Sequence, residues 1–219
     1  RRVMKAGYPV YTEKPPATTA AEALATARVA KQTGLLCMTA FKKRYTAATR
    51  RAREFLAEFN PEQWQSISID YCSGGYPEQS DGSCEFLFDF CIHAIDLVTD
   101  LFGEVAKVCC FARGPGTFEV LLRFANGAAG VMNLSRSRSF QVPTEETEIT
   151  VGGGNFMTIH NSSTWRITRS ETPSEWREPT TFISSGDSGY DTGHLAELEA
   201  FLEALDTGRP PRSSNTRSP

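Results

Sequence analysis

The sequence lacks several features that mark common classes of protein. No stretch approaches the roughly 18 consecutive apolar residues that suggest a membrane-spanning helix. Residues 1–7 have no apolar core of the kind found in signal peptides. The net charge of -3 gives no basic excess for nucleic-acid binding, and no internal repeat is present. These absences predict a cytoplasmic globular protein that binds neither nucleic acid nor a membrane.

Cysteine is present, but not in the patterns of disulfide frameworks or zinc sites. The six cysteines stand at positions 37, 72, 84, 91, 109 and 110, and none belongs to a Cys-x-x-Cys pair. This arrangement favours free thiols in a reducing compartment. No second cluster of candidate ligands supports a metal ion, so no metal site is predicted.

The most informative segment, residues 85–102, is apolar almost all round but carries one polar stripe. The stripe consists of Asp89, His93, Asp96 and Asp100, at spacings of 4, 3 and 4. Such spacing places the four side chains on one face of a helix. Because the other faces are apolar and therefore buried, the stripe is expected to face a cleft, a ligand or a polar partner.

Two interpretations of His93 stay open from spacing alone. A carboxylate one turn away, Asp89 or Asp96, would orient the imidazole and raise its pKa, as in a general acid/base that exchanges a proton with a substrate hydroxyl. Alternatively, His93 is a buried residue that its aspartate neighbours satisfy while it holds helix to sheet. Asp100, farther along, is expected to be solvated.

The N-terminal part is predicted to form a strand, a helix and a second strand. Residues 9–12 and 35–41 are apolar runs of strand length, and 19–33 is an Ala-rich helix with a capping-box pattern, ended by Gly34. Lys14 follows the first strand, at the edge where open α/β sheets bind ligands. Because most loop lysines are solvated, the residue type alone favours a plain surface position.

Arg44 and Tyr45 follow the second strand at the same predicted edge. Both side chains suit contacts with a polyhydroxylated ligand, and an ordinary helix start explains them equally well. A helix is expected over residues 45–59, with its basic side solvated.

The rest of the chain is predicted to be mostly antiparallel sheet. Strand patterns cover residues 64–71, 105–112, 118–124, 128–134, 146–151, 156–160 and 165–168. Asn126-Gly127 predicts a hairpin, whereas the glycine run 152–154 joins two strands and is therefore a turn, not a dinucleotide loop. A last amphipathic helix over 194–205 is expected to bury its leucines. The predicted class is α/β followed by α+β, with helices on one face of an open sheet.

Three of these segments resemble motifs of the Gfo/Idh/MocA family, the glucose-fructose oxidoreductase and inositol dehydrogenase group. Residues 6–15, Ala-Gly-Tyr-Pro-Val-Tyr-Thr-Glu-Lys-Pro, are similar to its Ala-Gly-x-x-Val-x-x-Glu-Lys-Pro strand. Residues 41–45, Phe-Lys-Lys-Arg-Tyr, are similar to its Phe-x-Arg-Arg-Phe/Tyr segment, with Lys43 at the first arginine. Residues 89–96 match its Asp-x-x-x-His-x-x-Asp helix, and Leu-Phe-Gly follows at 101–103.

The resemblance implies NAD(P)-dependent hydride transfer to or from a sugar, inositol or related polyol. It makes Lys14, His93 and Asp89 the catalytic residues, with His93 as the acid/base that handles the proton of the substrate hydroxyl. It further implies that Glu13, Lys14 and Pro15 bind the cofactor, NAD or NADP, and that Arg44, Tyr45, Asp89 and His93 bind the substrate. The alternatives are an NAD-dependent glycosidase and a non-catalytic binding or assembly module.

The resemblance also implies a domain plan. Residues 1–45 would be the C-terminal remnant of a Rossmann domain, 46–212 a substrate-binding and oligomerisation domain, and 213–219 a disordered tail. The family's G-x-G-x-x-G loop lies before its Glu-Lys-Pro strand, and only thirteen residues precede Lys14 here. The chain is therefore expected to be a fragment that binds cofactor poorly and is inactive alone, and to form a homo-oligomer through its open sheet.

Overall fold

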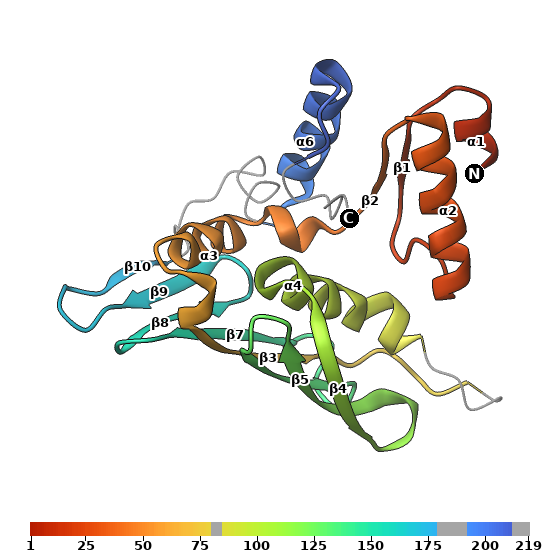
Figure 1. Ribbon diagram of the computed structural model, residues 1–219. Helices are drawn as coiled ribbons and strands as arrows, with labels where there is room; N and C mark the ends of the chain where they lie inside the picture. The colour runs from red at the N-terminus through yellow and green to blue at the C-terminus, as the bar shows by residue number, and fades with distance from the viewer. Residues whose placement is uncertain (80–84, 179–191, 212–219) are drawn as a thin grey trace.

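The computed structural model describes residues 1–79, 85–178 and 192–211. Its main body is an eight-stranded sheet with two helices packed on one face (Figure 1). A small α/β unit and the C-terminal helix α6 lie on that same side of the sheet, above the two helices in the view. The open α+β architecture expected from the sequence is confirmed.

The small N-terminal unit is the predicted βαβ arrangement. Its elements are α1 (Arg2–Lys5), β1 (Val10–Thr12), α2 (Ala20–Thr33) and β2 (Cys37–Thr39). The two strands pair in parallel, and Thr19 caps α2 through its side-chain oxygen. Gly34 ends α2 with a φ of 68°, a left-handed conformation that glycine adopts without a Cβ clash. The short helix α1 was not anticipated.

The large sheet is antiparallel at every neighbouring pair of strands but one. Its strands are β3 (Trp64–Cys72), β4 (Val105–Ala112), β5 (Thr117–Phe124), β6 (Ala129–Ser135), β7 (Thr144–Val151), β8 (Asn155–His160), β9 (Thr164–Thr168) and β10 (Glu175–Arg177). They lie in the order β10-β9-β8-β7-β3-β6-β5-β4, and the β3–β6 pair is parallel. β10 was not anticipated, because three residues are too few to show a period.

The core lies between the inner face of this sheet and the helices. The helical elements of this layer and the short turns near it are η1 (Lys42–Tyr45), α3 (Ala47–Ala57), η2 (Pro61–Gln63), η3 (Leu87–Cys91), α4 (Ile92–Phe102) and η4 (Gly114–Gly116). Phe55 of α3, Phe86 before η3, and Ile67, Met132 and Ile149 of the sheet are at most 2% exposed. Each such side chain contributes roughly 1.5–3 kcal/mol of burial free energy.

The segment predicted as one helix, residues 85–102, begins with a π-helical turn. η3 is π-helical, and the α-helical part starts only at Ile92. A π turn is wider than an α turn and often occurs at functional sites. The Asp89 side chain is 54% exposed, whereas His93 is 9% exposed. The members of the polar stripe therefore differ in their exposure.

Helix α6 (His194–Thr207) occurs where it was predicted, but the buried face is wrong. Leu198 and Leu202 are 45% and 58% exposed, whereas Glu197 is 1% exposed and Ala204 is buried. The helix meets η1 near its first turn, and the described residues leave the leucine face open. The contact with η1 and β1, not the apolar period, selects the buried side.

Two further expectations concern the described residues only in part. Cys37, Cys72, Cys91, Cys109 and Cys110 are free thiols, and Cys84 lies outside the described residues, as does the expected tail 213–219. Within the described ranges no helix is long and apolar enough to cross a bilayer. The domain boundaries at 45 and 212 stay a prediction.

Candidate active site

The loop after β1 brings Lys14 to the start of the helix that carries His93. The Lys14 Nζ atom lies 2.5 Å from Asp89 Oδ1 and also donates to the Asp89 main-chain oxygen. The two residues are 75 positions apart in the chain. The Tyr76 hydroxyl donates to the other carboxylate oxygen of Asp89 at 2.9 Å. These bonds, that from Lys14 foremost, hold the pKa of Asp89 below its ordinary value.

His93 lies one turn further along and is buried. The edge of its ring meets the Phe41 ring, with centroids 6.4 Å apart and an interplanar angle of 87°. Its Nδ1 atom is buried and has no hydrogen-bond partner among the described residues. Asp89 is held by Lys14 and Tyr76, as described above, so it does not take up this nitrogen.

The Asp89 carboxylate raises the pKa of His93, as expected, but stronger effects lower the net value. Burial, followed by the charges of Lys14, Lys43 and Lys42, lowers the pKa of His93 to about 3. Asp89 opposes these effects more weakly, because its charge is already paired with Lys14. His93 is therefore a neutral imidazole at neutral pH, able to accept a proton rather than to donate one.

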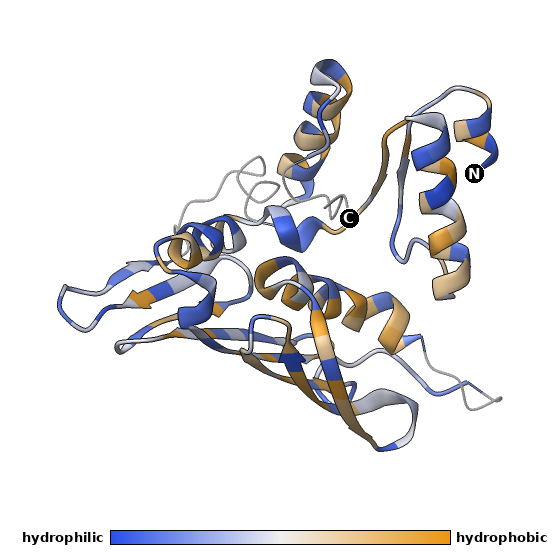
Figure 2. Ribbon diagram, viewed as in Figure 1, coloured by the Kyte–Doolittle hydropathy of each residue, from blue (hydrophilic) through white to orange (hydrophobic). Residues whose placement is uncertain are grey.

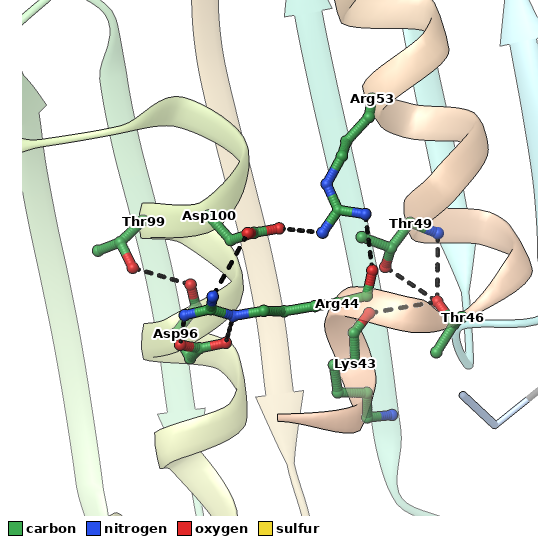
Figure 3. A network of polar contacts seen from close by, with 8 residues as sticks. All are labelled: Lys43, Arg44, Thr46, Thr49, Arg53, Asp96, Thr99 and Asp100. Atoms are coloured by element: carbon green, nitrogen blue, oxygen red, sulfur yellow. Dashed lines mark hydrogen bonds and ion pairs between the residues drawn. The ribbon is translucent and has the colours of Figure 1, made fainter. Parts of the chain in front are cut away.

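The third member of the stripe, Asp96, belongs to a buried ion-pair network. Arg44 forms two hydrogen bonds with Asp96, one of them from Nε to Oδ2 at 2.7 Å (Figure 3). The guanidinium also lies 3.8 Å from Asp100 Oδ1, and Arg53 pairs with the other oxygen of Asp100. The Asp100 side chain is 5% exposed, so the expectation that it is solvated is wrong. This network ties η1 and α3 to α4.

The remaining predicted site residues lie around this frame without all meeting in one place. Arg44 points its guanidinium at Asp96, and Tyr45 is half-buried in η1. Glu13 is exposed and its carboxylate accepts from the Lys14 main-chain N–H at 3.3 Å, while Pro15 is half-buried. Their assignment to substrate or cofactor stays a prediction.

Sequence reasoning missed a second buried lysine contact beside the site. Lys43 pairs with Glu145 of β7 and donates to Ser162 Oγ at 3.1 Å. Its ammonium also lies 5.8 Å from the centre of the Tyr71 ring. The Phe-Lys-Lys-Arg-Tyr motif pointed to position 43, but nothing in the sequence indicated its partner 102 positions away. Tyr76 was missed as well, because its loop has no periodic pattern.

The donor set suits an organic ligand better than a metal ion. No group of three histidine, cysteine or carboxylate residues that could hold a metal occurs within the described part of the chain. An unpartnered imidazole nitrogen on His93 and an ammonium on Lys14 are groups that can bind the polar atoms of an organic ligand, such as a nicotinamide or a hydroxylated substrate. The pyrophosphate of a dinucleotide is usually bound by a G-x-G-x-x-G loop, and residues 1–219 contain no such sequence.

Comparison with known proteins identifies the sheet region. Residues 73–157 match the family model described as the GFO/IDH/MocA C-terminal domain. This part of the chain is similar to a GFO/IDH/MocA C-terminal domain. It contains the π turn, α4, the strands from β4 to β7 and the first half of β8. The resemblance drawn from the motifs is thereby confirmed, and no curated protein sequence matches the chain.

Solved structures of Gfo/Idh/MocA type extend the similarity to nearly the whole chain. A dehydrogenase from Chromobacterium violaceum has a TM-score of 0.82 at 16% identity, over 97% of this chain and 66% of that one. UDP-N-acetylglucosamine 3-dehydrogenase from Acidithiobacillus ferrooxidans has a TM-score of 0.75 at 20% identity, over 95% and 65%. Levoglucosan dehydrogenase, in complex with NADH and L-sorbose, has a TM-score of 0.77 at 20% identity, over 94% of this chain and 66% of that one. The chain spans about two thirds of these structures, and at such identities the similarity is one of fold.

Proposed function

We propose that the chain belongs to an NAD(P)-dependent oxidoreductase that acts on a hydroxyl group of a sugar, inositol or related polyol. The observation that carries the proposal is the meeting of Lys14 with Asp89, one turn from a buried, neutral His93. The solved relatives include a sugar-nucleotide dehydrogenase and a levoglucosan dehydrogenase with bound NADH, which supports the same class of reaction.

In the proposed oxidation, a C–H and an O–H bond of the substrate break and a carbonyl forms. The nicotinamide, when bound, would supply the acceptor for the hydride. His93 takes the hydroxyl proton, for which its neutral imidazole is the correct form. Lys14, held by Asp89, places an ammonium beside the oxygen as negative charge develops on it. Asp89 thus orients Lys14, and its exposed side chain also suits a substrate hydroxyl.

Turnover by variants of the chain tests the acid/base assignment. Any nicotinamide reduction measured with a polyol panel and NAD+ or NADP+ at millimolar concentration should fall in His93→Ala, with kcat lower by a factor on the order of 10² to 10⁴. His160→Ala is the matched control, because His160 is exposed on β8. Normal turnover in the His93 variant would refute the role, and glycoside cleavage without net reduction would favour the glycosidase. We expect weak cofactor binding, since the phosphate loop is not among these residues.

We also propose that two copies associate through the outer face of the large sheet. The helices cover only the inner face (Figure 1), and the ribbons of β4 to β6 contain hydrophobic residues (Figure 2). Leu121 and Val131 lie directly opposite each other and are 50% and 44% exposed, and Phe111 on β4 is 68% exposed. Exposed apolar side chains on the uncovered face of the sheet favour an interface there.

A further inference from the structure

Glu197, on the first turn of α6, is a buried carboxyl group that the proposed reaction does not use. It is 1% exposed, and its Oε2 atom accepts a hydrogen bond from the Tyr11 hydroxyl at 2.7 Å. Its carboxyl group also lies close to the main chain of Phe41. Its Oε1 atom is buried without a partner among the described residues. A half-satisfied buried carboxyl destabilises a fold, so its position calls for a reason beyond packing.

The two residues beside Glu197 belong to β1 and to the segment that follows β2. Tyr11 lies on β1, three positions before Lys14. Phe41 follows β2, and its ring meets the edge of the His93 ring. One carboxyl group therefore contacts the strand that delivers Lys14 and the residue that packs on His93.

The first turn of α6 is also pressed against η1. Gly193 precedes the helix with a φ of 84°, and a Cβ built there would lie 2.1 Å from the Lys42 carbonyl oxygen. η1 includes Arg44, whose guanidinium donates hydrogen bonds to Asp96 on α4. A continuous path of close contacts thus runs from Glu197 to the helix that carries His93.

We propose that Glu197 is a positioning residue that fixes the ends of β1 and β2 relative to α4, so that Lys14 and His93 stay aligned. The inference rests on the proposed function, because it concerns the same site. Burial raises the pKa of Glu197 to about 7, so a neutral side chain of the same shape is compatible with this place. Glutamine should therefore replace it better than alanine, since its amide oxygen still accepts from Tyr11.

Amide hydrogen exchange of the 219-residue chain tests the positioning without any need for activity. In Glu197→Ala, the exchange rate in peptides 9–16 and 35–42 should rise about tenfold or more. This factor corresponds to the free energy of one lost hydrogen bond to a charged group. The exchange rates of β3 and β7 should not change. Glu197→Gln should stay close to the parent, and so should the control Glu203→Ala, an exposed position on the same helix. Unchanged exchange in peptides 9–16 and 35–42 of Glu197→Ala would overturn the proposal.

Kinetics and a second variant separate positioning from a merely structural role. Glu197→Ala should lower kcat about tenfold or more with little change in KM, and Glu197→Gln should restore it. If Glu197→Ala does not fold, Tyr11→Phe removes the same hydrogen bond by deleting one oxygen and should speed exchange in peptide 9–16. The exchange experiment decides the role of Glu197 whether or not the parent chain turns over a polyol, so its outcome is separate from that of the proposed function. Normal kcat in a folded Glu197→Ala protein contradicts the inference.

Discussion

The Arg44–Asp96 pair allows the sharpest prediction about stability. Arg44→Met keeps the length and apolar stem of the side chain but removes the guanidinium that satisfies Asp96. The two side chains are 10% and 8% exposed, so solvent screens the pair little. Removing one partner of a buried pair leaves an uncompensated charge, and the expected loss of unfolding free energy is about 3–5 kcal/mol.

Urea unfolding of Arg44→Met, Asp96→Leu and the double variant measures this loss. The double variant should recover most of it, because two apolar groups replace both charges and leave no carboxylate unpaired. Burial raises the pKa of Asp96 in the parent while Arg44 holds it down, so the pKa should rise further once Arg44 is gone. Native Arg44→Met then binds a proton on Asp96 that the unfolded chain releases. Its loss of unfolding free energy relative to the parent should therefore shrink as the pH falls from neutral toward 4.

The result bears directly on the assignment of Arg44 to substrate binding. A loss below about 1 kcal/mol in Arg44→Met, or a deficit that does not change with pH, would refute the structural role argued from the ion pair. In that case the predicted contact with a substrate would be the better explanation of the residue.

Two further outcomes follow from the site and the sheet. Lys14→Met should raise the pKa of His93 above about 3, because the Lys14 charge lowers that pKa more than any other effect except burial. A proton NMR titration of His93 checks this, and an unshifted pKa would contradict the electrostatic account. Leu121→Asp should shift the chain toward monomer in sedimentation velocity, because it puts a charge opposite Val131 on the apolar face, whereas an unchanged sedimentation coefficient would remove the outer face as the interface.

Local pattern was enough to predict most of the secondary structure. β4 has the bounds that its pattern predicted, and Thr19 and Gly34 begin and end α2 as their chemistry requires. The parallel pairing of β3 with β6 could not be predicted from the sequence, because strand order depends on contacts between residues 60 or more positions apart. The buried side of α6 was mispredicted for the same reason.

The sequence by itself determined which residues could do chemistry: a lysine after a strand, and a histidine with acidic neighbours on an apolar helix. The tertiary structure alone decided how these groups pair. It placed Asp89 on Lys14 rather than on His93, bound Asp96 and Asp100 to arginines, and buried His93 among positive charges. The physical reason is that charge and burial depend on all neighbours in space, whereas helical spacing describes only the neighbours on the same helix.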